Sequence, residues 1–291
     1  MHFSIRYFTE YVYDAPVADN LNALRVRPAT TSSQRCDEFT VRIDPEARLS
    51  RHSDYFGTEV LEFGIARPHS RLTIEVRARV VTAEPPEPPA AAWDEVETEA
   101  YAEAAGEYLL PGPEEPENGV LDDLVAAVRG ESPLATVNGL CELIPERFEY
   151  RAGVTYVGTT VEEFLEAGAG VCQDYVHLGL VLLRRSGIAA RYVSGYLWAT
   201  SEEGGQDSLE VETHAWLEAL LPGHDGRGEP MWVGADPTNR RLAGETHVKI
   251  GHGRHYADVP PVKGVFQGAA TSKLDASVQM TRLDPQAGAR A

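Results

Sequence analysis

The stretch Gly170-Val171-Cys172-Gln173-Asp174-Tyr175 places a cysteine where a glycine-containing turn gives way to an apolar helical run. The helix predicted from this point carries Val176, Leu180 and Leu183 as its buried stripe and stops at Gly187. The first N–H groups of a helix lack intrahelical partners and the helix dipole is positive there, so this position stabilises a thiolate. The same N–H groups can hold the oxyanion that forms when a thiolate attacks a carbonyl. For a lone cysteine, burial as a small core residue is still the commoner interpretation.

Two later segments strengthen the interpretation of Cys172 as a nucleophile: Thr213-His214-Ala215-Trp216 and Asp236-Pro237-Thr238-Asn239. They belong to two predicted strands that a Gly- and Pro-rich loop joins into a hairpin. If the hairpin ends Leu221 and Met231 face each other, His214 and Asp236 share one face, about one diagonal step apart. The carboxylate can then orient the imidazole while the other ring nitrogen faces the thiol. The sequence therefore predicts acyl transfer or amide hydrolysis, although a single His–Asp pair is as often a structural hydrogen bond.

The chain before this region is predicted to be β structure. Leu72, Ile74, Val76, Ala78 and Val80 alternate with polar residues, which is typical of a strand with one wet face. Similar alternation recurs in two earlier segments, and turn residues separate the strands. An antiparallel, sandwich-like domain is the expected result. With the helical second half, the fold class is α+β.

Proline-rich segments indicate the domain boundaries. Glu84-Pro85-Pro86-Glu87-Pro88-Pro89 reads as a stiff polyproline spacer, and an acidic helix from about Trp93 to Tyr108 is expected after it. Ser132-Pro133 and Thr160-Val161-Glu162-Glu163 are helix-start signatures in the second half, and the acidic 202–207 segment reads as a surface loop. The predicted units are an N-terminal β domain at 1–85, a spacer at 86–118, a catalytic domain at 119–281 and a loose tail at 282–291.

The motifs around Cys172, His214 and Asp236 together resemble the transglutaminase-like superfamily of papain-fold cysteine enzymes, in its bacterial and archaeal branch. The segments 191–196 and 253–261 are similar to that branch, as is Asp54-Tyr55-Phe56-Gly57 in the β domain. The resemblance implies a papain-like catalytic core with Cys172 as nucleophile, His214 as general base and acid, and Asp236 as the orienting carboxylate. His255 departs from the pattern, which has aspartate there, and this puts local substrate contacts in doubt rather than the chemistry.

Composition restricts the partners. The 291 residues carry a formal net charge of -19, which disfavours nucleic acid and anionic membranes as partners. Only Lys249, Lys263 and Lys273 are lysines among the 26 basic residues, which suggests a salt-rich cytoplasm or a GC-rich genome.

Three scattered cysteines form no disulfide framework and the N-terminus lacks a signal-peptide pattern, so a cytoplasmic location is predicted. The expected partner is a protein or peptide substrate, no cofactor is predicted, and the oligomeric state is open.

Several neighbouring residues carry weaker predictions. Gln173 is a candidate oxyanion donor or a simple helix-start residue, and Trp216 is a candidate wall of the substrate cleft or a packing residue. The late histidines His247, His252 and His255 lack the close spacing of a zinc site, so no metal is predicted. A peptidase or amidohydrolase is the preferred function. The alternatives are a protein-glutamine transglutaminase, an inactive peptide- or protein-binding module, and a metal-dependent hydrolase that uses the late histidines.

Overall fold

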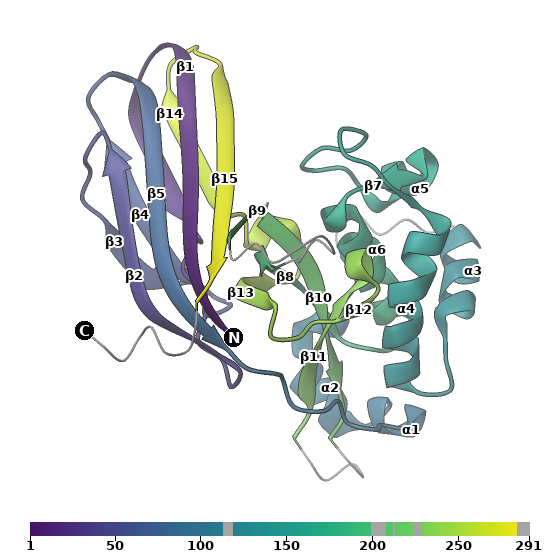
Figure 1. The fold of residues 1–291 in the computed structure, drawn as a ribbon. Coiled ribbons are helices and arrows are strands. Elements are labelled where there is room, and N and C mark those ends of the chain that lie inside the picture. Colours follow the sequence, from purple (N-terminus) through teal and green to yellow (C-terminus); the bar gives the residue numbers. More distant parts are fainter. Residues whose placement is uncertain (113–118, 199–207, 212, 224–228, 284–291) are drawn as a thin grey trace.

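The computed structural model describes residues 1–112, 119–198, 208–211, 213–223 and 229–283, and it has the predicted α+β architecture. A large antiparallel sheet lies on one side, a five-stranded sheet lies in the middle, and helices cover the far face of the five-stranded sheet (Figure 1). The acidic 202–207 segment and the end of the tail lie outside the described residues. Within the described residues, no helix is long and apolar enough to cross a membrane.

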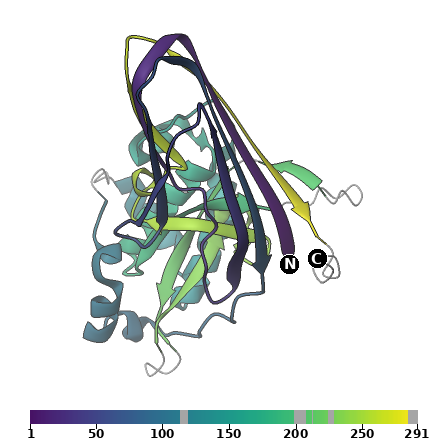
Figure 2. The same ribbon diagram turned by 90° about the vertical axis from the view of Figure 1, so that its left-hand side faces the viewer.

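The first sheet is organised around one long strand. The first half of β1 pairs with β5 and β15, and its second half pairs with β4 and β14, so β1 contributes to both parts of the sheet (Figure 2). The predicted alternation in residues 72–80 is confirmed, because those five apolar side chains are all buried. The strands are β1 (His2–Leu24), β2 (Gln34–Asp44), β3 (Ser50–Ser53), β4 (Glu59–Ile65), β5 (His69–Thr82), β9 (Ser208–Val211), β14 (Val262–Gln267) and β15 (Ser272–Arg282).

The end of the chain differs from its predicted assignment. Strands β14 and β15 pair with β1 in the first sheet, although the sequence places residues up to 281 in the catalytic domain. Only Val278 and Met280 of β15 are buried, so the alternation that would reveal this strand is short. The expected helix from Trp93 to Tyr108 also differs, because it is broken into three short elements. Thr98 starts a new helix by accepting a hydrogen bond from the N–H of Tyr101.

The second half of the chain forms the mixed α/β part. Its five-stranded sheet has the order β12-β11-β10-β8-β13, and a two-stranded parallel pair, β6 with β7, lies beside the start of α6. The predicted caps at Ser132 and Thr160 are confirmed, since both side chains accept a backbone N–H at the start of their helices. The strands are β6 (Glu149–Tyr150), β7 (Ala169–Gly170), β8 (Ala190–Leu197), β10 (Thr213–Leu221), β11 (Met231–Asp236), β12 (Arg241–Leu242) and β13 (His247–Gly253), and the helices are α1 (Trp93–Val96), α2 (Glu99–Ala105), α3 (Gly119–Val128), α4 (Pro133–Arg147), α5 (Val161–Ala167) and α6 (Cys172–Arg185).

Two main hydrophobic cores hold these layers. One core packs α3, α4 and α6 against the face of β10 that carries Leu217 and Ala219. The other core runs between the two sheets and includes Tyr196 and Trp198 together with the buried side chains of β1 and β5. The five-stranded sheet is therefore covered on both faces, which fixes the positions of its strand ends.

Candidate active site

Cys172 is the first residue of α6, as predicted, and its side chain is partly exposed. Asp174 organises this helix start, because its Oδ2 accepts the backbone N–H of Val171 at 2.8 Å and the hydroxyl of Thr155 at 2.7 Å. Gly170 is needed here, since a Cβ at this residue would lie 2.5 Å from Oδ2 of Asp174. Within the described chain, no hydrogen-bond acceptor is found for the backbone N–H of Cys172 or Gln173. These two N–H groups are free to receive an anion.

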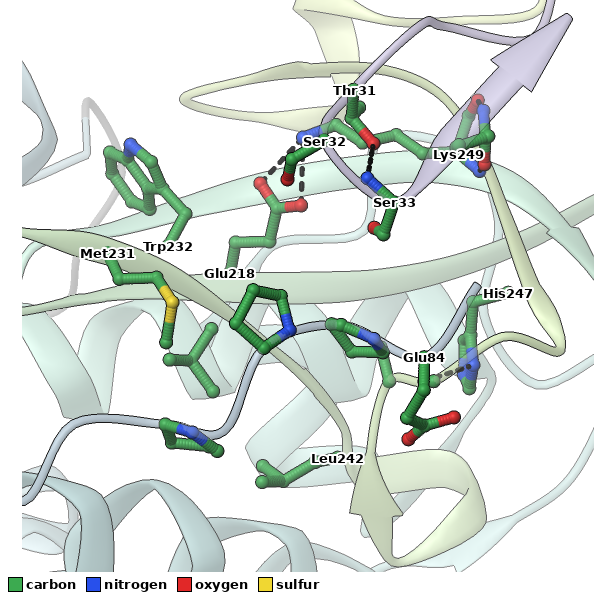
Figure 3. Close-up of a pocket in the computed structure, with 18 of the residues that line it drawn as sticks. Thr31, Ser32, Ser33, Glu84, Glu218, Met231, Trp232, Leu242, His247 and Lys249 are labelled. Carbon is green, nitrogen blue, oxygen red and sulfur yellow. Dashed lines mark hydrogen bonds and ion pairs between the residues drawn. The ribbon is translucent and has the colours of Figure 1, made fainter. Parts of the chain in front are cut away.

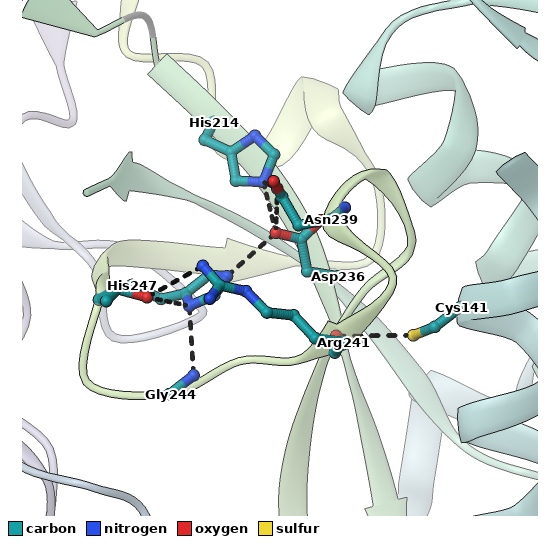
Figure 4. Close-up of polar contacts among 8 residues, drawn as sticks. Cys141, His214, Asp236, Asn239, Arg241, Gly244 and His247 are labelled. Atoms are coloured by element: carbon teal, nitrogen blue, oxygen red, sulfur yellow. Dashed lines mark hydrogen bonds and ion pairs between the residues drawn. The ribbon is translucent and has the colours of Figure 1, made fainter. Parts of the chain in front are cut away.

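His214 and Asp236 come together through the hairpin that the sequence predicts. Strands β10 and β11 pair with Leu221 opposite Met231, which is the predicted register. The Nε2 atom of His214 lies 2.8 Å from Oδ2 of Asp236 (Figure 4). Because Nε2 is used in this contact, Nδ1 is the ring nitrogen left for the thiol of Cys172, whose interaction with the ring is one of the causes that shift the pKa of His214. The His214–Asp236 contact of the predicted triad is therefore present, and Cys172 as its third member remains a prediction.

Asp236 is fully buried and is held by more than His214. Its Oδ1 accepts the backbone N–H of Asn239 at 3.2 Å, and its Oδ2 accepts the Asn239 side-chain amide at 2.7 Å. The Nε2 atom of His247 lies 3.0 Å from the same Oδ2. Burial alone would raise the pKa of this carboxyl, but the hydrogen bonds from His214 and His247 outweigh it and hold the pKa far below the usual range. Asp236 is therefore charged at neutral pH.

The charge on Asp236 sets the protonation of His214. Burial lowers the pKa of His214, whereas the hydrogen bonds and charges of Asp236 and Cys172 raise it, and the net result is a pKa of about 9. Since an unperturbed histidine has a pKa of about 6.5, His214 carries a proton at neutral pH. Such an imidazolium can stabilise a thiolate and can later donate its proton to a leaving group.

The comparisons with known proteins agree with the predicted resemblance. The bacterial transglutaminase-like N-terminal region matches residues 3–81, and the transglutaminase-like superfamily model matches residues 122–237. An uncharacterized protein of Mycobacterium leprae is 33% identical over 282 residues, which cover 94% of this chain and 96% of that protein. The chain belongs to the transglutaminase-like superfamily.

Two other proteins are similar to this chain, one in its fold and one in part of its sequence. A crystal structure of a proposed cysteine protease from Cytophaga hutchinsonii has the same fold, with a TM-score of 0.72 and 22% identity, and the match covers 98% of this chain and 92% of that one. The protein-glutamine gamma-glutamyltransferase of Pseudomonas aeruginosa is 31% identical over 108 residues, which are 34% of this chain and 15% of that protein.

The other predicted site residues of this transglutaminase-like protein lie in different surroundings. Gln173 is partly exposed next to Cys172, where a role as an oxyanion donor remains a prediction. Trp216 is only 2% exposed and packs against the rings of His214 and His247. This position below the histidines is a packing position, and a direct contact of Trp216 with substrate remains a prediction.

The late histidines do not converge on one point. His252 accepts from Arg191, and His255 stacks on His177 at 4.1 Å between ring centroids. Among the described residues, one group has the geometry to hold a metal ion: His214, Asp236 and His247, whose ligand atoms lie within 4.8 Å of one another. In this group the two imidazoles already contact the carboxylate, so their hydrogen bonds account for the arrangement. Sequence reasoning missed this role of His247, since its distance along the chain from Asp236 gives no signal of contact.

The superfamily core also has a pocket on the face of its sheet opposite to α6. The pocket has a volume of about 620 Å³, and Cys172 is not among the residues that line it. Its wall contains a largely buried ion cluster, in which Glu218 accepts from Lys249 at 2.6 Å (Figure 3). Glu218 also accepts from Arg191 at 2.6 Å. Burial lowers the pKa of Lys249 to about 8, although the charge of Glu218 opposes this effect. His247 and Trp216 line the same pocket. The pocket therefore lies next to two residues that contact Asp236 and His214.

Proposed function

We propose that this protein is a cysteine hydrolase that cleaves amide or peptide bonds through a thioester acyl-enzyme. The observation that carries the proposal is the contact between the imidazole of His214 and the buried carboxylate of Asp236, and the thiol of Cys172, at the start of α6, also acts on this imidazole. A binding cleft has no need of all three groups in hydrogen-bonding order, whereas nucleophilic catalysis needs each of them. The proposed substrate is a protein or peptide.

The proposed reaction has two stages. With the thiol proton on His214, the state that its raised pKa favours, Sγ of Cys172 attacks the substrate carbonyl, and the oxyanion is stabilised by the free N–H groups at the start of α6. The tetrahedral intermediate collapses to a thioester, the C–N bond breaks, and His214 donates its proton to the leaving amine. In the second stage His214 accepts a proton from water, the hydroxyl adds to the thioester carbonyl, and the thiol leaves with the acid as product.

Acyl transfer to an amine is the second candidate for the same site. It differs only in the second stage, in which a primary amine replaces water and an amide is formed. The match of 108 residues to a protein-glutamine gamma-glutamyltransferase favours this candidate. Hydrolysis is preferred because water is always present at the thioester, whereas an amine must first be bound.

A labelled-peptide screen with and without a primary amine donor tests both candidates. Wild type is compared with Cys172→Ala, and Cys36→Ala serves as the control because Cys36 is also a free, partly buried thiol but lies on β2 of the first sheet. We expect Cys172→Ala to lower the rate by at least about 10³-fold, while Cys36→Ala leaves it unchanged. A carboxylic acid product indicates hydrolysis, and an amide product indicates transfer.

Two results would overturn the proposal. The first is turnover that survives Cys172→Ala. The second is no turnover of any peptide or glutamine substrate, together with alkylation of Cys172 by iodoacetamide no faster than that of Cys36. The second result would favour the inactive binding module.

A further inference from the structure

The proposed reaction uses Asp236 but leaves one of its partners without a role. Oδ2 of Asp236 lies 2.8 Å from Nε2 of His214 and 3.0 Å from Nε2 of His247, and it accepts the amide of Asn239 at 2.7 Å (Figure 4). The two histidines approach this oxygen from different strands, β10 and β13. A single carboxylate oxygen therefore connects His214 with a second, deeply buried imidazole.

The hydrogen bonds of His247 define its tautomer. Its Nδ1 accepts the backbone N–H of Gly244 at 3.2 Å, so this nitrogen carries no proton. The proton of a neutral ring is then on Nε2, which donates to Asp236. A neutral donor can orient a carboxylate without competing with the charge on His214.

The surroundings keep His247 neutral. Burial is the largest cause and lowers the pKa of His247, while the hydrogen bond to Asp236 opposes it; the charges on His214 and Arg241 lower the pKa further. Glu84, from the proline-rich spacer, and Lys249, from β13, line the same pocket as His247. The net direction is a lowered pKa, which agrees with the tautomer given by the Gly244 contact.

Packing fixes the ring of His247 in this orientation. The ring meets Trp216 edge to face at 5.2 Å between centroids, and Trp216 in turn stacks near His214 at 6.2 Å. Trp216 is 2% and His247 is 6% exposed. One tryptophan therefore packs against both imidazoles that contact Asp236.

We propose that His247 is a positioning residue of the active site, whose Nε2–H holds Oδ2 of Asp236 against His214. This inference rests on the proposed function, because it assigns His247 a role in the same triad. The residue touches neither the thiol nor the substrate, and it acts through Asp236. Without this donor the carboxylate is free to rotate toward Asn239 alone, and its contact with His214 loosens.

Two substitutions and a control separate positioning from a merely structural role. His247→Gln can keep a side-chain N–H near the position of Nε2, while His247→Ala removes the donor and leaves a space that opens onto the 620 Å³ pocket (Figure 3). The control is His252→Gln, because His252 lies on the same strand, is also held neutral by a pKa lowered to about 3 through burial, and does not line that pocket.

We expect kcat/KM to fall by about 10- to 100-fold in His247→Ala, the effect of losing one hydrogen bond to a charged group. Most of the activity should remain in His247→Gln and in the control. Added imidazole should restore activity to His247→Ala in a saturable manner and should leave wild type and the control unchanged. In His247→Ala the alkaline limb of the pH profile should move to lower pH, because His214 loses part of the contact that raises its pKa.

The proposal is overturned if His247→Ala lowers activity equally at every pH and imidazole restores none of it. It is also overturned if His247→Gln is as impaired as His247→Ala while both melt like wild type. NMR titration of His214 in the full chain provides a measurement that needs no turnover. A downward shift of the His214 pKa in His247→Ala supports the positioning role, whether or not the wild type is active. If the wild type has no Cys172-dependent activity, the proposed function is refuted, but the positioning role is not.

Discussion

Asp236 shows how a buried carboxylate can remain charged when none of its contacts in the described part of the chain is a lysine or an arginine. It is fully buried, and its contacts are two imidazoles, one side-chain amide and one backbone N–H. Burying a charged carboxylate costs a large desolvation energy, which these hydrogen bonds must offset. Burial lowers the pKa of His214, but the charge and hydrogen bond of Asp236, together with the interaction with Cys172, outweigh this effect and raise it. The raised pKa of His214 therefore depends on a carboxylate that has no exposed surface.

Asp236→Asn tests this link directly. In the fold the raised pKa of His214, about 9, favours the protonated ring. That stabilisation is fully present below the ordinary pKa of about 6.5 and is lost as the pH rises through about 9. In Asp236→Asn we expect kcat/KM to fall on the order of 10²- to 10⁴-fold, with the alkaline limb moving down toward pH 6.5. A pH profile that keeps its alkaline limb near 9 would show that another group raises the pKa.

At the scale of single elements, the sequence predicted the helix start and the strand register, which local rules decide. The start of α6 follows from a glycine turn before an apolar run, and the contact of His214 with Asp236 follows from the hairpin register. The contact of His247 with Asp236 could not be predicted in this way. It depends on the segment after β12 crossing the sheet, where Ala243 packs over Gly234, and no periodicity encodes that crossing.

Asp174 gives a prediction for the element that carries the nucleophile. The side chain is buried, caps α6 through Val171, and ties Thr155 of the 151–160 loop to the helix start. Asp174→Ala removes two hydrogen bonds to a carboxylate, one of which caps α6, so we expect a loss of about 2–4 kcal/mol in the free energy of unfolding. We also expect slower alkylation of Cys172, since the first turn loosens.

Urea denaturation of Asp174→Ala beside Asp122→Ala measures this effect. Asp122 is also an aspartate in the first turn of a helix, but its side chain is 76% exposed and forms an ion pair with Arg185. We expect Asp122→Ala to change stability by less than about 1 kcal/mol. Equal losses in the two variants would contradict the structural role assigned to Asp174.

At the scale of the whole molecule, the two units are less separable than the sequence suggests. The proline-rich spacer lies between the first sheet and the transglutaminase-like core in the chain. Yet β14 and β15 return to pair with β1, and Tyr196 of β8 and Trp198, which follows β8, are part of the core between the sheets. Return strands and shared cores are long-range features, which is why the alternation within each strand could not reveal them.

Trp198→Ala tests whether the two units unfold together. Trp198 is 3% exposed and its ring lies 5.7 Å from that of Phe3, between centroids. Truncating it leaves a cavity in the shared core, so we expect a loss of about 3–5 kcal/mol in the free energy of unfolding. Leu274→Ala on β15 is the control, because Leu274 is 54% exposed and its truncation should change stability by less than about 0.5 kcal/mol.

Far-ultraviolet circular dichroism and the alkylation rate of Cys172 should report one coincident transition, shifted in Trp198→Ala alone. If the first sheet melts at a different urea concentration from the part that contains Cys172, the shared core does not couple the two units.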